Sequence, residues 1–193
     1  MDIISLLVLL LIAGVLGIGA LVIVAFLYYY NRIVVLANRI DNAWSQIDVQ
    51  LTKRADLIPN LVETVKGYMK HEQKVFIAVT EARAGLMNAK GVEDRAKAGN
   101  MLQDTLKTLF AVAENYPELK ANTNFLKMQE DLTDVENKIA YTRQFYNDSV
   151  LSFNNMVTTI PGMWFAGFMN KKQKPYLEAP AEKREVPKVK FDM

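Results

Sequence analysis

An unbroken apolar segment at the start of the chain constrains the fold more than any other feature of this sequence. Residues 3–30 contain no Lys, Arg, Asp or Glu. At a rise of about 1.5 Å per residue, a helix of this length exceeds the roughly 20 residues that cross the hydrocarbon core of a bilayer. We therefore predict a transmembrane anchor over residues 1–31. Its apolar and aromatic positions include Ile3, Leu6, Leu10, Leu16, Val22, Phe26, Tyr28, Tyr29 and Tyr30.

The flanks of this segment favour a retained anchor over a cleaved signal peptide. No positive residue precedes the apolar run, and no small-x-small cleavage site is followed promptly by polar sequence. The three tyrosines lie where an interfacial aromatic belt is expected, and Arg32 follows at once. Positive charge after but not before the span favours an N-out/C-in orientation in the cell membrane. That rule has little force for one span with so short a leader, so the opposite orientation stays open.

The composition excludes several classes of function. The chain has 193 residues, so about one ordinary domain remains beyond the anchor. All 23 Lys and Arg lie in that part, together with every one of the 21 acids except Asp2, and it is therefore close to charge-balanced. This balance argues against a nucleic-acid partner, which needs a concentrated basic face. The absence of cysteine excludes disulfides, thiolate metal sites and cysteine nucleophiles.

Apolar residues beyond the anchor recur at spacings of three and four, which predicts helices throughout. The first helix is continuous with the anchor and runs to about Asp56, and Pro59 opens the second, which ends near residues 90–91. We expect a third helix over 93–115 and a fourth from 122 or 123 to 160. Short connections make neighbouring helices antiparallel, so the fold class is an all-α, up-down-up-down bundle over residues 32–160. The predicted helix junction carries Arg54, Asp56, Pro59 and Asn60.

The topology returns the end of the fourth helix to the membrane, where residues 161–170 form an apolar, aromatic segment. Two interpretations are open: the segment contacts the bilayer interface, or it folds over the end of the bundle or over a neighbouring subunit. The candidate interface residues are Met163, Trp164, Phe165, Phe168, Lys171 and Lys172. Residues 171–193 contain three prolines among mixed charges and predict an extended, charged tail.

No residue pattern in the chain is typical of a catalytic, metal or cofactor site. The single histidine, His71, cannot supply the paired Glu-x-x-His motifs of a di-metal bundle, and we expect it on a solvated helix face. The acidic residues of 130–136 interleave with an apolar seam, which predicts an exposed face. Phosphate-binding loops, nucleophile elbows and HExxH motifs are absent. We therefore expect no enzymatic activity, no cofactor and no metal.

Five stretches of the sequence resemble the bacterial LemA family. They are residues 43–51 (AWSQIDVQL), 54–68 (RADLIPNLVETVKGY), 81–83 (EAR), 113–117 (AENYP) and 139–147 (IAYTRQFYN). The resemblance implies a long antiparallel helical bundle on an N-terminal anchor in the bacterial cell membrane. It also implies a partner or scaffold role, because family members occur beside membrane proteases and other envelope proteins, and the family has no agreed catalytic residues.

These observations predict a non-enzymatic, single-pass membrane protein that self-associates into a homo-oligomeric scaffold, with itself and the lipid bilayer as partners. Polar and aromatic residues alternate around the fourth helix at 141–147, which is typical either of a second covered face or of tyrosines at a monomer's surface. The alternative function is a monomeric or dimeric adaptor that presents its bundle to an envelope protease or another membrane protein.

Overall fold

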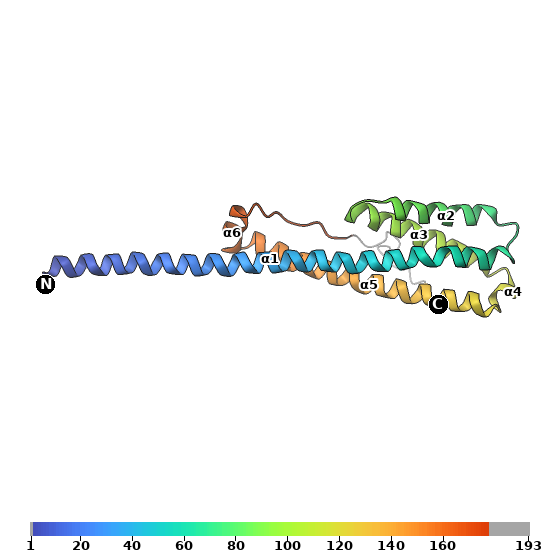
Figure 1. Ribbon diagram of the computed structural model, residues 1–193, viewed down its shortest axis with the longest axis horizontal. Helices are drawn as coiled ribbons and strands as arrows, with labels where there is room; N and C mark the ends of the chain where they lie inside the picture. Colours follow the sequence, from blue (N-terminus) through green and yellow to red (C-terminus); the bar gives the residue numbers. More distant parts are fainter. Residues whose placement is uncertain (1, 178–193) are drawn as a thin grey trace, which may run out of the picture. The chain divides into compact units, whose positions relative to one another are not determined.

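The computed structural model describes residues 2–177, and most of them are helical. The predicted all-α class is confirmed, because no strand occurs within the described residues. The predicted tail beyond residue 177 lies outside them. The helices, labelled in Figure 1, are α1 (Ile3–Lys66), α2 (Gln73–Asn88), α3 (Val92–Ala113), α4 (Pro117–Lys120), α5 (Thr123–Thr158) and α6 (Gly162–Phe168).

The chain forms two compact units, and both α1 and α5 contribute to each. Unit 1 contains the chain up to Asp41 together with Asp148–Pro175. Of the described residues, unit 2 contains Asn42–Asn147 together with Tyr176 and Leu177. The predicted domain boundaries at residues 31, 160 and 170 separate the anchor, the bundle, the aromatic segment and the tail, whereas the two units are defined by compactness. The predicted boundaries therefore remain predictions.

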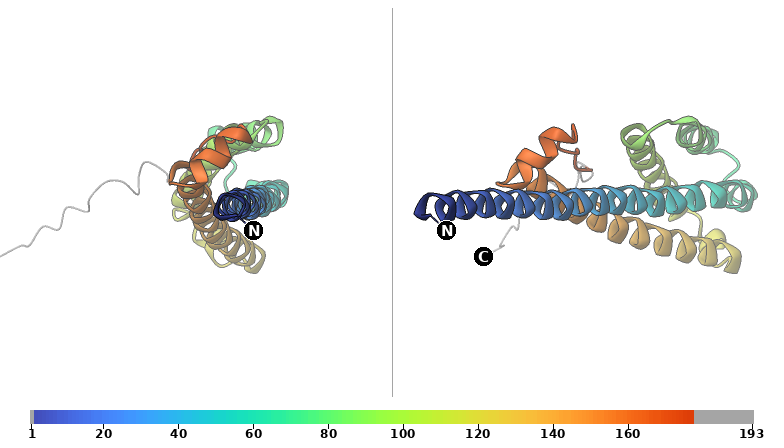
Figure 2. Two further views of the ribbon diagram at one scale, coloured as in Figure 1. Left: turned by 90° about the vertical axis from the view of Figure 1, so that its left-hand side faces the viewer. Right: turned by 60° about the vertical axis from the view of Figure 1, so that its left-hand side comes forward.

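Unit 2 is the helical bundle proper. Its core follows the spacing of three and four read from the sequence, since each helix buries only one stripe. Residues 89–91 join α2 to α3, which lie side by side in the views of Figures 1 and 2. Gly91 adopts φ +82° at this turn, a conformation that favours glycine. The buried side chains include Ile47, Leu51, Ile58, Leu61, Val65, Val79, Leu86, Leu102, Leu109, Leu119 and Ile139.

The predicted helix junction at residues 57–60 is wrong, because α1 continues through Pro59 to Lys66. Proline has no N–H and therefore leaves the carbonyl four residues earlier, that of Ala55, without its helical donor. Arg83 of α2 supplies the missing bond, since its Nε donates to the Ala55 carbonyl at 2.8 Å. A tertiary contact thus replaces the lost helical bond and allows the helix to continue.

The first turn of the bundle lies instead at residues 67–72, between α1 and α2. Met69 is fully buried there and closes this end of the core. His71 is exposed as expected, but it lies in this turn and not on a helix. The side-chain amide of Asn122 donates to the Tyr68 hydroxyl at 2.9 Å, and the Tyr116 hydroxyl donates to Glu72 at 3.1 Å.

The predicted start of the last long helix is confirmed, together with its cap. The backbone N–H of Phe125 donates to Asn122 Oδ1 at 3.0 Å, which satisfies one of the unpaired amides at the start of α5. The short helix α4, with Pro117 in its first turn, was not predicted. Both α3 and α5 otherwise lie within two residues of their predicted bounds.

Unit 1 pairs the early part of α1 with the end of α5 and with α6. Side chains from the two long helices form its core, and α6 buries Gly162 and Ala166. Before residue 25, every described side chain of α1 is exposed. The buried apolar residues of the long helices in this unit are Ile33, Leu36, Ile40, Val150, Phe153 and Val157.

Candidate functional surfaces

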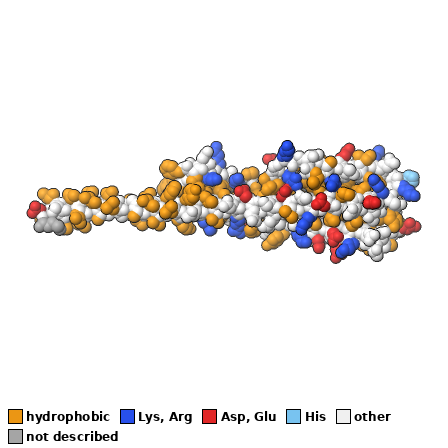
Figure 3. Space-filling view, viewed as in Figure 1, with side chains coloured by type: hydrophobic (Ala, Val, Ile, Leu, Met, Phe, Trp, Pro, Cys, Tyr) orange, Lys and Arg blue, Asp and Glu red, His pale blue; other side chains and the backbone are white. Residues whose placement is uncertain are grey.

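The first part of α1 has the properties of a membrane anchor. It is long and apolar enough to cross a membrane, and none of that segment is buried within the protein. Figure 3 shows mostly hydrophobic side chains along this end of α1, whereas the Lys and Arg side chains and most of the Asp and Glu side chains lie elsewhere. The predicted anchor residues Ile3, Leu6, Leu10, Leu16, Val22, Phe26, Tyr28 and Tyr30 are exposed, and Tyr29 is half-buried. Which of them face lipid remains a prediction.

The aromatic segment predicted after the last long helix forms α6, and one of its rings packs against α1. The Phe165 ring stacks on Tyr29, with 5.0 Å between ring centroids and an interplanar angle of 7°. Phe165 also meets Phe26 edge-on at 6.1 Å. Both α1 residues lie at the end of the apolar run. The structure therefore joins α6 to the end of the anchor, within unit 1.

The other predicted interface residues point away from the protein. Trp164 is 58% exposed and Phe168 86% exposed, and Met163, Lys171 and Lys172 are also exposed. Of the six candidate interface residues, only Phe165 has its aromatic ring packed on α1. The remaining five are available to a partner outside this chain.

Close packing at one end and a hydrogen-bonded cap at the other fix α6 in place. A Cβ at Gly162 would overlap the backbone carbonyl oxygen of Met156, so any larger residue would displace the start of α6. At its end, Asn170 adopts φ +49°, and the N–H of Lys171 donates to the Ala166 carbonyl at 3.0 Å. This left-handed cap turns the chain out of the helix.

After α6 the chain runs extended over residues 171–177, and asparagines of α5 hold its backbone. In unit 1, Asn154 Nδ2 donates to the Lys174 carbonyl at 2.9 Å, and Asn154 Oδ1 accepts from the Lys174 N–H at 2.8 Å. In unit 2, Asn147 makes the same pair of bonds with Leu177, at 3.0 and 2.9 Å. Each asparagine satisfies both backbone groups of one residue, so these contacts are independent of the tail's side chains.

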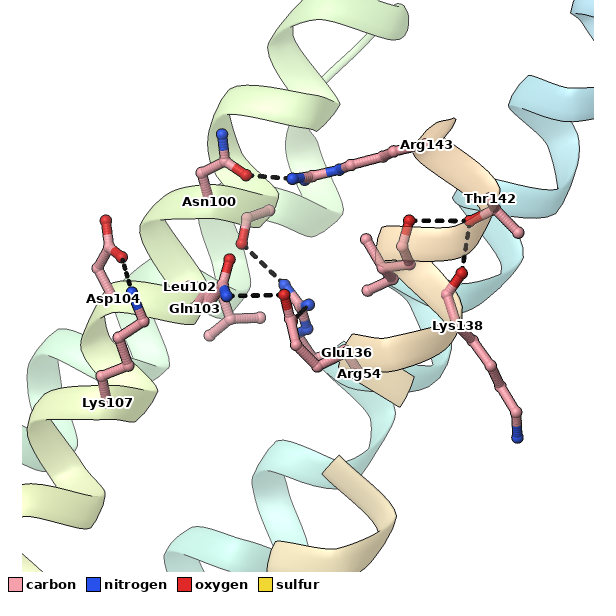
Figure 4. Close-up of polar contacts among 12 residues, drawn as sticks. Arg54, Asn100, Leu102, Gln103, Asp104, Lys107, Glu136, Lys138, Thr142 and Arg143 are labelled. Atoms are coloured by element: carbon pink, nitrogen blue, oxygen red, sulfur yellow. Dashed lines mark hydrogen bonds and ion pairs between the residues drawn. The ribbon is translucent and has the colours of Figure 1, made fainter. Parts of the chain in front are cut away.

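A buried arginine joins three helices of unit 2 (Figure 4). Arg54 of α1 is only 1% exposed. Its Nη1 donates to the Gly99 carbonyl of α3 at 3.0 Å, and its Nη2 forms an ion pair with Glu136 Oε2 of α5. The second carboxylate oxygen of Glu136 accepts from Gln103 Nε2 at 2.7 Å. The buried charge is therefore neutralised and hydrogen-bonded, as a buried ion must be.

Burial and, secondarily, the like charge of Arg143 lower the pKa of Arg54 to about 10. The guanidinium therefore remains protonated at neutral pH. Burial also lowers the pKa of Arg143, whose Nη2 donates to Asn100 Oδ1 of α3 at 2.7 Å. Arg95 of α3 forms an ion pair with Asp48 of α1. These arginines link α3 to both long helices, an arrangement that stabilises a bundle and presents no reactive group.

Sequence reasoning placed some of these residues wrongly. Of the predicted junction residues, Arg54 is buried, whereas Asp56, Pro59 and Asn60 are exposed on α1. The acidic residues of 130–136 were expected on an exposed face. Glu136 contradicts this, because it is half-buried against Arg54.

The burial of Arg54 is foreshadowed by its position in the sequence. The spacing of three and four through Leu51 and Ile58 puts Arg54 on the apolar stripe, where a charge requires a partner. Asn147 and Asn154, which bind the backbone of the extended segment, gave a weaker signal, because they are only a pair of asparagines seven residues apart on α5. No motif in the tail identified their ligand.

Within residues 2–177, no three His, Cys, Asp or Glu side chains come together in a group that could hold a metal ion. Beside Arg54 there is a hollow of about 240 Å³, lined by Gln103, Glu136 and neighbouring residues. In this hollow Glu136 binds both Arg54 and Gln103.

Comparison with known proteins identifies the family of this helical chain. The model of the LemA family matches residues 43–191. The chain belongs to the LemA family. The family match begins after the apolar part of α1 and covers all of α2–α6. The resemblance seen in the sequence is therefore confirmed.

Three curated relatives of this LemA-family chain are similar to it over long segments. The magnetosome protein MamQ of Magnetospirillum gryphiswaldense is 25% identical over 197 residues, which cover 86% of this chain and 72% of that protein. The magnetosome protein MamQ 2 of Paramagnetospirillum magneticum is 25% identical, with coverages of 83% and 70%. Protein LemA of Metamycoplasma hominis is 27% identical over 127 residues, which cover 63% of this chain and 56% of that protein.

These findings give the coarse character of the protein. The apolar helix and the LemA-family relatives indicate a membrane-anchored helical protein. Neither the family description nor the names of the relatives indicate an enzymatic activity.

Proposed function

We propose that this LemA-family chain is a non-enzymatic, single-pass protein of the bacterial cell membrane that self-associates into a homo-oligomeric scaffold. The anchor supports this proposal because it confines the subunits to two dimensions. Confinement raises the effective concentration of neighbours, so weak lateral contacts between bundles suffice for assembly. The charge pattern around the anchor favours the N-out/C-in orientation.

The observation that carries the proposal is a lateral surface on unit 2. Tyr141 projects from α5 and is 72% exposed. It borders a hollow of about 330 Å³, which Gln50 of α1 and Asp134 and Lys138 of α5 also line. An exposed aromatic ring beside a hollow with both signs of charge suits contact with another protein, because tyrosine gives large contact area at low entropic cost.

The first test is the particle mass of the pure full-length protein in mild detergent, corrected for bound detergent. We expect a discrete mass several times the 21.9 kDa of one chain. A monomer or dimer would contradict the scaffold and favour the adaptor, which should then copurify with a stoichiometric partner.

A pair of variants tests the surface itself. Tyr141→Arg should reduce the particle mass, because a charge at the centre of an interface is costly to desolvate. Leu126→Arg is the matched control, since Leu126 lies on the same helix and is 48% exposed. Both positions face solvent in the single chain, so both variants should fold. Equal masses for Tyr141→Arg and the parent would exclude this surface from assembly.

A further inference from the structure

The position of α6 relative to the anchor is set by aromatic contacts inside unit 1. Phe165 stacks on Tyr29 and touches Phe26, at the end of the apolar run of α1. From Ile3 to Phe26 a helix rises about 35 Å, slightly more than the roughly 30 Å hydrocarbon thickness of a bilayer. The contacts therefore hold α6 at the level where α1 leaves the hydrocarbon core.

The side of α6 that does not pack on α1 is apolar. Trp164 and Phe168 are 58% and 86% exposed, and Met163 is 44% exposed. Exposing these apolar side chains to water is unfavourable in free energy. Tryptophan, in contrast, is enriched at the boundary between headgroups and acyl chains. Because α6 is fixed to the end of the anchor, a bilayer that α1 spans would lie next to these side chains.

The positive charge of the segment that follows α6 fits an anionic membrane surface. Lys171, Lys172 and Lys174 follow α6, and no acid occurs between residues 149 and 175. Asn154 binds both backbone groups of Lys174, so the lysines are held close to α6. Lysines close to an anionic leaflet are attracted to its headgroups.

We propose that α6 is a second membrane contact of this protein, which lies in the headgroup region of the leaflet where α1 emerges. Trp164 and Phe168 enter the boundary with the acyl chains, and Lys171, Lys172 and Lys174 bind anionic headgroups. Together the anchor and α6 give unit 1 two attachments to one bilayer, which restrains the tilt of α1 relative to the membrane. This contact is independent of self-association.

The two tryptophans of the chain allow a direct test. Trp44→Phe leaves Trp164 as the only tryptophan of the full-length protein, which is then reconstituted into phosphatidylcholine vesicles. Lipids brominated near the headgroup should quench Trp164 emission about twofold or more, and lipids brominated deep in the acyl chains should quench it less. The matched control, Trp164→Phe, retains Trp44, which packs on Tyr146 in unit 2 and should not be quenched.

Two results would overturn the proposal. Trp164 emission that neither bromine position quenches would show that α6 is covered by protein, or is in water, instead of lipid. Stronger quenching by the deep bromines would place α6 in the hydrocarbon core and not among the headgroups.

The lysine contribution is measured in the same Trp44→Phe background. Added phosphatidylglycerol should increase shallow quenching of Trp164, and Lys→Gln substitution at residues 171, 172 and 174 should abolish that increase. An undiminished increase would remove the lysines from the contact. The charge-matched control carries Lys→Gln at three exposed positions of unit 2, namely Lys70, Lys74 and Lys127.

Discussion

Replacing Arg83 with methionine tests whether a tertiary hydrogen bond keeps α1 continuous past its proline. Methionine retains the apolar part of the side chain but cannot donate to the Ala55 carbonyl, which Pro59 leaves without a helical donor. Ala55 is fully buried, so water cannot take the place of the guanidinium. A hydrogen bond from a charged donor contributes about 1.5–3 kcal/mol, and we expect Arg83→Met to cost about 2 kcal/mol.

A double-mutant cycle isolates this bond. In a Pro59→Ala background the N–H of residue 59 can donate to the Ala55 carbonyl, so Arg83→Met should then cost about 1–2 kcal/mol less than it does beside proline. For a chain of this size 1 kcal/mol corresponds to a Tm change of about 2–4 °C, which circular dichroism of the full-length protein in detergent resolves.

The control and the refuting outcome are both defined by the cycle. Glu81→Met lies on the exposed face of α2 and should change Tm by no more than about 1–2 °C in either background. If Arg83→Met lowers Tm equally with proline and with alanine at residue 59, the bond does not compensate for the proline, and the reasoning is refuted.

Further predictions address the arginine cluster and the placement of α6. Glu136→Ala leaves a buried guanidinium without its counter-charge and should lower the free energy of unfolding by about 3 kcal/mol. This value is in the lower part of the usual range because the Glu136 side chain is 31% exposed. The control Glu130→Ala, at an exposed position, should cost under about 0.5 kcal/mol, and thermal unfolding measures both. Gly162→Ala should shift α6 and abolish the quenching of Trp164 emission by brominated lipids. Gly167→Ala should leave that quenching intact, because a Cβ at residue 167 would meet open space. Asn154→Leu should accelerate tryptic cleavage of the extended segment after α6 about tenfold, because two hydrogen bonds worth about 1–1.5 kcal/mol together are lost, and an unchanged rate would show that they do not hold the segment.

Much of the fold followed from local patterns that physical chemistry makes nearly obligatory. The apolar run predicted a helix able to cross a membrane, and the spacing of three and four predicted an all-α bundle, because each helix must bury one stripe. Asn122 marked the start of α5 correctly, since an asparagine there can accept from an amide that no helical carbonyl serves. These features depend on residues close together in the sequence.

The errors arose where a distant residue decided the outcome. Proline at residue 59 argued for a helix break, and the local argument was sound until Arg83 of another helix supplied the missing donor. Glu136 belongs to the same acidic cluster as the exposed Glu130 and Asp134, and only the position of Arg54 makes it part of an ion pair with a buried arginine. The two bonds from Asn154 to the backbone of Lys174 could not be predicted, because every residue has the same backbone groups and the sequence does not mark which one an asparagine binds.

The sequence by itself determined the helical class, the apolar anchor, the family and the composition of the surface that follows α5. Each of these depends on hydrophobic periodicity, length or a contiguous motif, which a linear reading contains in full. Only the tertiary structure decided that α1 passes through its proline, that a buried arginine unites three helices, and that the Phe165 ring stacks on Tyr29. Hydrogen bonds, ion pairs and ring contacts of this kind join residues far apart in the chain, so their energies exist only once the helices have packed.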